Sequence, residues 1–144
     1  MNSRIKLNEV DPEGYKALFP LEAHIKKGVL DHKHLHLIKI RASQINGCAF
    51  CIDMHTKEAR KDGETEQRIY ALNAWRETPF FTEEERAVLA LTEEVTLIQH
   101  RVSDDTYNRA AELLGADYLA QVVLAAIAIN SWNRVAISTH MMPQ

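Results

Sequence analysis

The glycines and prolines constrain the fold of this sequence more than any other feature, because they stand where helices should begin or end. All five glycines and most of the prolines occupy such positions. No useful length of chain alternates between apolar and polar residues with the period of two that a half-buried strand requires. The pattern therefore predicts an all-α fold of about six or seven helices.

Local signals at helix ends predict where these helices lie. The Asp11-Pro12 pair is typical of an N-cap followed by proline at the first helical position, and Pro20 should bend or break the helix that follows. Thr82 and Glu85 have the spacing of a capping box. With Asp31 and Ser103 as further N-caps, the expected helices run from 11 toward 27, 32 to 44, 48 to 62, 64 to 76, 82 to about 99, 103 to 114, and 117 to 138.

The expected helix at 32–44 is apolar on two sides. Its apolar positions form one stripe of Leu35, Ile38, Ala42 and Ile45 and a second of Leu37 and Ile40. A helix with two apolar sides is buried between neighbours or lies at a subunit contact. The expected helix at 117–138 is the most apolar of all and should form the middle of the core or of an interface.

Length and charge narrow the class of protein. A chain of 144 residues fits one domain, 1–144. A net charge of -3 gives no general reason to bind nucleic acid or an anionic membrane. The first ten residues lack the apolar run of a signal peptide. The longest apolar run, Val122 to Ile129, is shorter than the ~20 residues that span a bilayer. We therefore expect a cytoplasmic protein without nucleic-acid or membrane partners, where a CxxC is more often catalytic or metal-binding than structural.

The only two cysteines, Cys48 and Cys51, stand three residues apart, with His55 four residues after the second. Each helical residue advances about 100°, so Cys51 lies about 60° and His55 about 20° from Cys48, and all three should project from one face. Thiols at this spacing can form a disulfide. Unpaired N–H groups in the first helical turn favour a thiolate there. The arrangement suits reversible oxidation of a thiolate to a sulfenic acid and then a disulfide.

Two other interpretations fit the same spacing. Both cysteines could be small buried hydrophobic residues. They could also bind zinc with His55, although zinc usually takes four ligands and the fourth would have to come from His32, His34 or His36. The turn-forming Asn46-Gly47 directly before the motif and the histidine in register favour the redox dithiol, and we expect no resident metal or cofactor.

The segment 35–60, "LHLIKIRASQINGCAFCIDMHTKEAR", strongly resembles the core of the AhpD-like alkylhydroperoxidase family, a branch of the carboxymuconolactone decarboxylase superfamily. The CxxCxxxH spacing and the sequences on either side of it carry the resemblance. Segments 75–98 and 126–137 are similar to later helices of the family, so the resemblance covers most of the chain after Gly14. It implies an all-helical fold that assembles into a homo-oligomer, namely a dimer, trimer or hexamer.

The resemblance also implies a peroxidase that reduces organic hydroperoxides. In characterised relatives the second cysteine attacks the peroxide, so Cys51 would attack, Cys48 would be the resolving thiol and proton donor, and His55 would belong to the proton relay. An external thiol or dithiol, in some relatives carried by a lipoylated protein, would reduce the resulting disulfide. A thiol redox sensor or disulfide-exchange protein with little peroxide turnover is the alternative. The superfamily also suggests a decarboxylase, although the CxxC branch is distinct from it.

This sequence departs from the family pattern at two positions. Members usually carry a glutamate of the proton relay twelve residues before the first cysteine, where this chain has His36. A histidine can shuttle protons near neutral pH, but it does not offer a permanent carboxylate. Some members also have a histidine just before the second cysteine, where this chain has Phe50. We therefore keep His36 as a candidate relay residue, and the missing carboxylate motivates the sensor alternative.

Overall fold

The computed structural model of the protein describes residues 3–144. Over these residues the chain forms nine α-helices, two short 3-10 helices and no strands, so the all-α prediction is confirmed but the number of helices exceeds the expected six or seven. The α-helices are α1 (Leu7–Val10), α2 (Pro12–Lys16), α3 (Phe19–Lys27), α4 (His32–Asn46), α5 (Ala49–Lys61), α6 (Glu66–Tyr70), α7 (Glu83–Thr96), α8 (Asp104–Leu114) and α9 (Ala116–Thr139); the 3-10 helices are η1 (Leu72–Glu77) and η2 (Ile98–His100).

The helix ends with clear capping signals lie where the sequence predicts them. The Asp31 carboxylate accepts a hydrogen bond from the Lys33 backbone N–H at 2.8 Å and opens α4. Thr82 and Glu85 form both hydrogen bonds of a capping box at the start of α7. The Ser103 hydroxyl accepts a hydrogen bond from the Thr106 backbone N–H and caps α8. These caps satisfy N–H groups that have no partner within the helix.

Of the additional helices, α1 lies ahead of the first predicted helix, and the others arise where predicted helices divide. The first divides into α2 and α3, with Pro20 in the first turn of α3, because proline cannot donate the hydrogen bond that would continue the preceding helix. The segment 64–76 divides into α6 and η1, where Leu72 and Trp75 are both buried. The backbone is kinked at Ala74, between these two residues, and both side chains enter the same core cluster.

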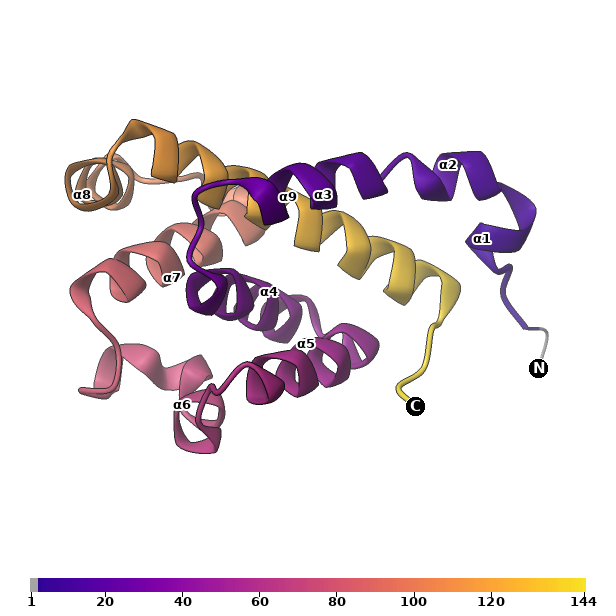
Figure 1. Cartoon of the computed structure of the whole chain (residues 1–144), viewed down its shortest axis with the longest axis horizontal. Helices are drawn as coiled ribbons and strands as arrows, with labels where there is room; N and C mark the ends of the chain where they lie inside the picture. The colour runs from indigo at the N-terminus through magenta and orange to yellow at the C-terminus, as the bar shows by residue number, and fades with distance from the viewer. Residues whose placement is uncertain (1–2) are drawn as a thin grey trace.

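Helix α4 lies at the centre of the molecule and packs against α5, α7 and α9 (Figure 1). Its two apolar stripes enter different parts of the core. Leu35, Ile38 and Ala42 join a cluster with residues of α7 and α9, while Leu37 and Ile40 join a second cluster that contains Leu72, Trp75 and Leu89. The prediction that this helix is buried between neighbours is confirmed.

Helix α9, the longest of the described helices, packs against α3, α4, α5, α7 and α8. By length and composition alone this helix could cross a membrane. The uninterrupted apolar run within it, from Val122 to Ile129, is too short to indicate this from the sequence. Its buried face supplies Val122, Ala126 and Ile129 to the larger core cluster. The packing of this apolar helix against five others accounts for its composition and confirms the prediction that it lies in the middle of the core.

Buried asparagines fix the end of α4 against α9. Asn133 is fully buried and its Nδ2 donates to the Ser43 hydroxyl at 3.0 Å. Asn46 Nδ2 donates to Asn133 Oδ1 and to Asn130 Oδ1, both at 2.9 Å. Because Asn46 is the last residue of α4, these bonds determine where the next segment, which carries both cysteines, begins.

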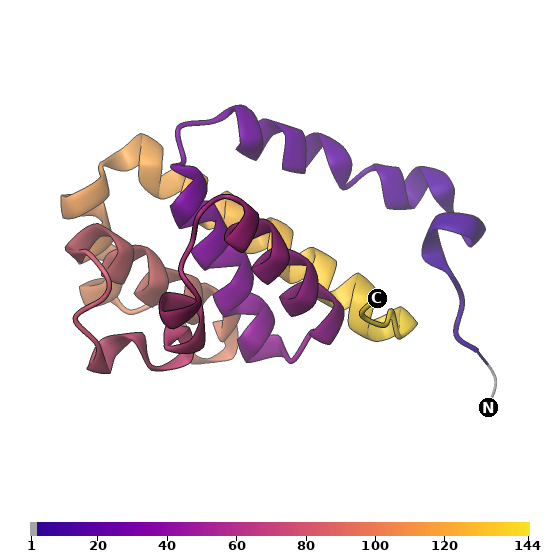
Figure 2. The ribbon, with the colours of Figure 1, turned by 60° about the horizontal axis from the view of Figure 1, so that its bottom comes forward.

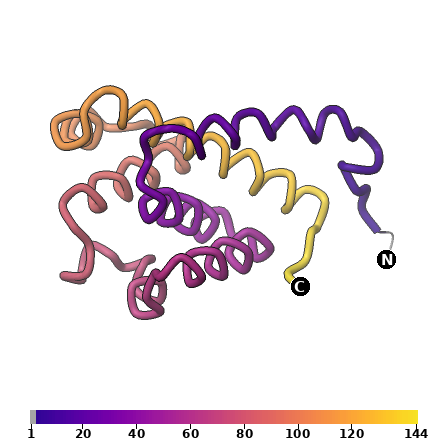
Figure 3. Tube along the Cα trace, viewed as in Figure 1, coloured from indigo at the N-terminus to yellow at the C-terminus, as the bar shows by residue number. Residues whose placement is uncertain are grey.

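The N-terminal helices form an arm on the outside of this bundle. Helix α3 packs along α9, while α1 and α2 extend beyond the end of the bundle (Figures 1 and 2). The N- and C-terminal segments lie at the same end of the molecule (Figure 3), where the Arg4 guanidinium donates to the carbonyls of Ile137 and Ser138. The arm therefore covers the part of α9 that precedes the C-terminal segment.

Replacing Asn133 with Ala should destabilise the oxidised protein by about 1–3 kcal/mol, because the buried Ser43 and the half-buried Asn46 each lose one hydrogen-bond partner. Urea denaturation of the wild type and the variant would measure the loss. The matched control is Ser138→Ala on the exposed side of α9, which should change the free energy of unfolding by less than about 0.5 kcal/mol. Equal stabilities for the two variants would contradict this role of the asparagines.

Candidate active site

A left-handed glycine separates α4 from the helix that carries the cysteine motif. Gly47 has a φ of 70° and terminates α4, a conformation that glycine adopts without the steric cost of a side chain. Cys48 follows with extended backbone and is the N-cap of α5, and its Sγ accepts a hydrogen bond from the Cys51 backbone N–H at 3.3 Å. The CxxC therefore lies at the N-terminus of a central helix, as predicted. The expectation that all three motif side chains project from one helical face is wrong for Cys48, which precedes the helix.

The two cysteines are joined by a disulfide, with their Cα atoms 5.3 Å apart. Both are buried, with exposed fractions of 1% for Cys48 and 3% for Cys51. They pack with Ala136 of α9, and Phe50 and Met141 cover this cluster. Within residues 3–144 no group of three His, Cys, Asp or Glu side chains is arranged to hold a metal ion. The spacing of the motif thus serves a disulfide-forming pair.

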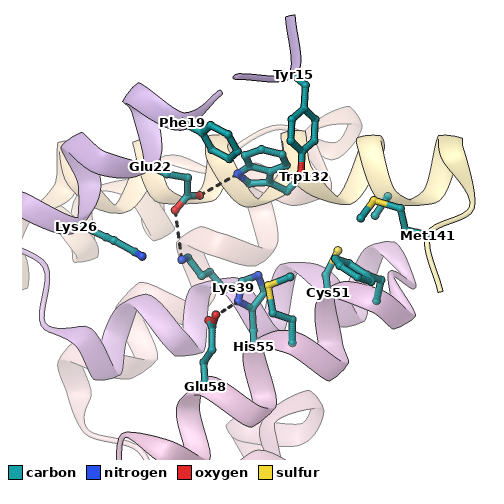
Figure 4. A pocket seen from close by; sticks show the side chains of 13 residues that line it. Tyr15, Phe19, Glu22, Lys26, Lys39, Cys51, His55, Glu58, Trp132 and Met141 are labelled. Atoms are coloured by element: carbon teal, nitrogen blue, oxygen red, sulfur yellow. Dashed lines mark hydrogen bonds and ion pairs between the residues drawn. The ribbon is translucent and has the colours of Figure 1, made fainter. Parts of the chain in front are cut away.

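A cavity of about 300 Å³ opens onto Cys51, and Cys48 is not among the residues that line it. Its walls come from α2, α3, α4, α5 and α9 and from the C-terminal segment (Figure 4). The apolar part of the lining consists of Tyr15, Phe19, Phe50, Met54, Trp132, Ala136 and Met141, and the charged or titratable part of Glu22, Lys26, Lys39, His55 and Glu58. One sulfur of the pair therefore faces a largely apolar cavity that is open to solvent.

His55 lies one helical turn after Cys51 and also lines this cavity. Its Nδ1 is 3.1 Å from Glu58 Oε2. Because a carboxylate can only accept a hydrogen bond, Nδ1 carries the proton, and the lone pair of the neutral ring lies on Nε2. Burial lowers the pKa of His55 below its ordinary value of 6.5, and the hydrogen bond that His55 donates to Glu58 opposes this only in part. The imidazole is therefore neutral at pH 7 and able to accept a proton.

A buried ion pair lies in the same cavity. Lys39 Nζ of α4 is 3.4 Å from Glu22 Oε2 of α3, and the Trp132 indole N–H donates to the other oxygen of Glu22 at 3.1 Å (Figure 4). Only 7% of Lys39 is exposed. The sequence patterns above do not single out Glu22, Lys39 or Glu58. The spacing of three residues between His55 and Glu58 could have indicated their contact, whereas the ion pair joins two helices whose contact the sequence does not reveal.

His36 lies away from the cavity. Its Nε2 is 2.6 Å from Asp62 Oδ2, and Asp62 caps the C-terminal end of α5, opposite to the end that carries Cys48. The hydrogen bond from His36 lowers the pKa of Asp62 below its ordinary value. The structure thus brings Cys48, Cys51 and His55 together and places His36 of α4 beside the C-terminal end of α5.

This combination of an all-helical bundle and a CxxC at the start of a central helix agrees with the comparison with known families. Residues 12–94 match the model of the carboxymuconolactone decarboxylase family. The chain belongs to this family, and to its AhpD-like members.

Three proteins illustrate the relationship. YdfG of Bacillus subtilis (strain 168), an uncharacterised protein, is 48% identical over 139 residues, which are 96% of this chain and 95% of YdfG. Atu0492 of Agrobacterium tumefaciens, described as a protein of unknown function and a candidate AhpD antioxidant defence protein, has 40% identity, a TM-score of 0.95 and 99% coverage of both chains. The debrominase Bmp8 has 16% identity and a TM-score of 0.84, and the likeness, one of fold alone, covers 93% of this chain and 73% of Bmp8.

Replacing Glu58 with Gln should lower the pKa of His55 further, because the hydrogen bond and the negative charge of Glu58 both raise it. An NMR titration of the His55 ring protons in the oxidised protein would measure the shift. The control is Asp53→Asn, which removes an acid of the same helix that pairs with Lys57 and should leave the titration unchanged. A His55 pKa that rises in the Glu58→Gln variant would contradict the assignment.

Proposed function

We propose that this protein is a CxxC-dependent peroxidase that reduces organic hydroperoxides through a sulfenic acid on Cys51 and a Cys48–Cys51 disulfide. The supporting observation is that Cys51, but not Cys48, faces an apolar cavity together with a neutral His55. Membership of the AhpD-like family supports redox chemistry at this pair. The assignment of Cys51 as the attacking thiol and Cys48 as the resolving thiol agrees with this difference in access.

The first half of the reaction consumes the hydroperoxide. In the reduced protein, His55 Nε2 accepts the proton of the Cys51 thiol, and N–H groups of the first turn of α5 favour the thiolate. The thiolate attacks the terminal oxygen of the hydroperoxide, so an S–O bond forms as the O–O bond breaks. The alkoxide leaves, takes the proton from the imidazolium and departs as an alcohol. Cys51 is now a sulfenic acid and has been oxidised by two electrons.

The second half restores the dithiol. The Cys48 sulfur attacks the Cys51 sulfenic acid, the two sulfurs join, and the hydroxyl leaves with the Cys48 proton as water. An external dithiol then reduces the disulfide by thiol–disulfide exchange and is itself oxidised. Because both sulfurs are buried, we expect a small dithiol or one carried on a flexible arm, such as the lipoyl group of a lipoylated protein. Action in the cytoplasm and assembly into a homo-oligomer are further parts of this proposal.

A thiol redox sensor with little turnover is the second candidate. The contact of His36 with Asp62 favours this candidate. Family members carry their relay glutamate at the position of His36, and here that position supplies no group to the cavity. Steady-state kinetics with an excess of dithiol distinguish the two candidates. Many turnovers per molecule eliminate a sensor without catalysis, whereas one oxidation per molecule eliminates the peroxidase.

Replacing Cys51 with Ser should abolish hydroperoxide consumption in the presence of a dithiol, because no nucleophile then faces the cavity. Replacing Cys48 with Ser should permit one oxidation per molecule and leave a sulfenic acid on Cys51, which dimedone would trap for detection by mass spectrometry. Far-UV circular dichroism checks that both variants fold. Consumption by the Cys51→Ser variant at the wild-type rate would refute the proposal.

Replacing Phe19 with Ala should reduce selectivity for bulky hydroperoxides, because its ring stands 5.5 Å from Tyr15 and 5.7 Å from Trp132 in the cavity wall. We expect kcat/KM for cumene hydroperoxide to fall about 10-fold, which corresponds to the loss of roughly 1.4 kcal/mol of apolar contact. The value for hydrogen peroxide, which is too small to contact the wall, should be unchanged. An equal loss for both substrates would indicate damage to the dithiol instead.

A further inference from the structure

The cavity beside the dithiol contains a buried positive charge that the mechanism above does not use. We propose that the Lys39 ammonium stabilises the negative charge on the Cys51 thiolate and, during the reaction, on the departing alkoxide, and that Glu22 and Trp132 are positioning residues that hold Lys39 there. The part of this inference that concerns the alkoxide rests on the proposed function. The part that concerns the thiolate does not.

The position of Lys39 meets the requirements of this role. It lines the same cavity as Cys51 and His55 and is almost fully buried. An ammonium group has three N–H donors, and among residues 3–144 its Nζ makes one hydrogen bond, at 3.4 Å to Glu22. Figure 4 shows Lys39 between Glu22 of α3 and His55 of α5. Donors of Lys39 are therefore left for groups inside the cavity.

The other charged groups around the cavity leave this role to Lys39. Helix α3 contributes Glu22 and the exposed Lys26, and α5 contributes His55 and the half-exposed Glu58. Tyr15 comes from α2, whereas α9 contributes only Trp132 and Ala136. His55 is neutral at pH 7 because burial lowers its pKa, an effect to which the charge of Lys39 adds. The buried cation of the cavity is thus Lys39, and the imidazole is the base.

Stability alone does not explain this ion pair. Removing two charges from water costs free energy that their attraction does not always recover, and apolar residues of similar volume often serve a core equally well. The pair lies at the wall of a cavity that is otherwise largely apolar and that Cys51 also lines. In surroundings of low polarity a nearby positive charge strongly favours an anion.

The arrangement of the carboxylate explains how Lys39 is held. One oxygen of Glu22 accepts from the Trp132 indole, and the other contacts Lys39. Glu22 therefore fixes the ammonium and also offsets part of its charge. During the attack the negative charge passes from the Cys51 sulfur to the leaving oxygen, both inside the cavity, and the proton that neutralises it comes from His55. Lys39 lowers the energy of both anions without transferring a proton.

The test measures the pH at which Cys51 becomes a thiolate, in reduced protein that carries Cys48→Ser so that Cys51 is the single thiol. The rate of alkylation by iodoacetamide as a function of pH gives this midpoint. Lys39→Met should raise the midpoint by about one pH unit, since the loss of a positive charge from the cavity disfavours the thiolate. Lys39→Arg should restore most of the shift. Lys33→Met, on the exposed side of the same helix, should not move the midpoint.

Glu22→Gln gives the sharpest discrimination, because it should lower the midpoint by leaving the Lys39 charge without its counter-ion. A merely structural ion pair would predict the same change for both variants. The double variant Glu22→Gln/Lys39→Met removes both charges and should show a midpoint above the wild-type value. If Lys39→Met does not fold, the direction of the Glu22→Gln shift still decides the question. Midpoints that do not move, or that move in the same direction for Lys39→Met and Glu22→Gln, overturn the inference.

A second measurement separates this inference from the proposed function. With both cysteines present, Lys39→Met should reduce kcat/KM for an organic hydroperoxide by about 10-fold or more at pH 7, which matches a midpoint shift of one unit. If the wild type does not reduce hydroperoxides at all, the proposed function fails. The alkylation midpoints then decide by themselves whether Lys39 stabilises the thiolate.

Discussion

The position of Cys48 just before α5, and not within it, determines what each sulfur of the motif can do. An N-cap residue has extended backbone, so its side chain turns back over the first helical turn, and the Cys51 N–H reaches the Cys48 sulfur. Both cysteines pack with Ala136 of α9, but of the two only Cys51, inside the first turn, lines the cavity. The left-handed Gly47 and the buried Asn133 define this geometry from the preceding side. The different access of the two sulfurs follows from the backbone, before any particular substrate is considered.

The two buried nitrogen-bearing side chains of the cavity, His55 and Lys39, have different partners, and this difference defines their roles. His55 has only the half-exposed Glu58 as a partner, and burial favours its neutral form. Lys39 has a well-held carboxylate partner in Glu22, which the Trp132 indole fixes from the other side. A charge this deeply buried needs such a partner, because water cannot reach it. The site therefore combines a proton acceptor with a separate positive charge. A single histidine could not replace both, because it accepts a proton only when neutral and carries a positive charge only when protonated.

Features that depend on a few neighbouring residues could be predicted from the sequence, and features that depend on distant contacts could not. The capping residues, the two apolar stripes of α4 and the disulfide-forming CxxC all follow from local spacing. The division of segment 64–76 was missed because burial of Leu72 and Trp75, not local propensity, determines it. His36 was assigned by its position in the motif, but α4 directs it to the far end of α5, where Asp62 accepts its hydrogen bond. The upper wall of the cavity was missed since it comes from the N-terminal arm, whose packing on α9 leaves no pattern in the sequence.

Local geometry and distant packing form different parts of this cavity. The segment from Gly47 to Glu58 carries both sulfurs, and its geometry is set by a turn, a cap and helical spacing, while Ala136, Met141 and Lys39 reach the same site from other elements. The arm adds Tyr15, Phe19, Glu22 and Lys26 to the cavity wall, and the rings of Tyr15 and Phe19 pack on Trp132. Changes in the arm can therefore alter the shape and charge of the cavity while the dithiol keeps its geometry.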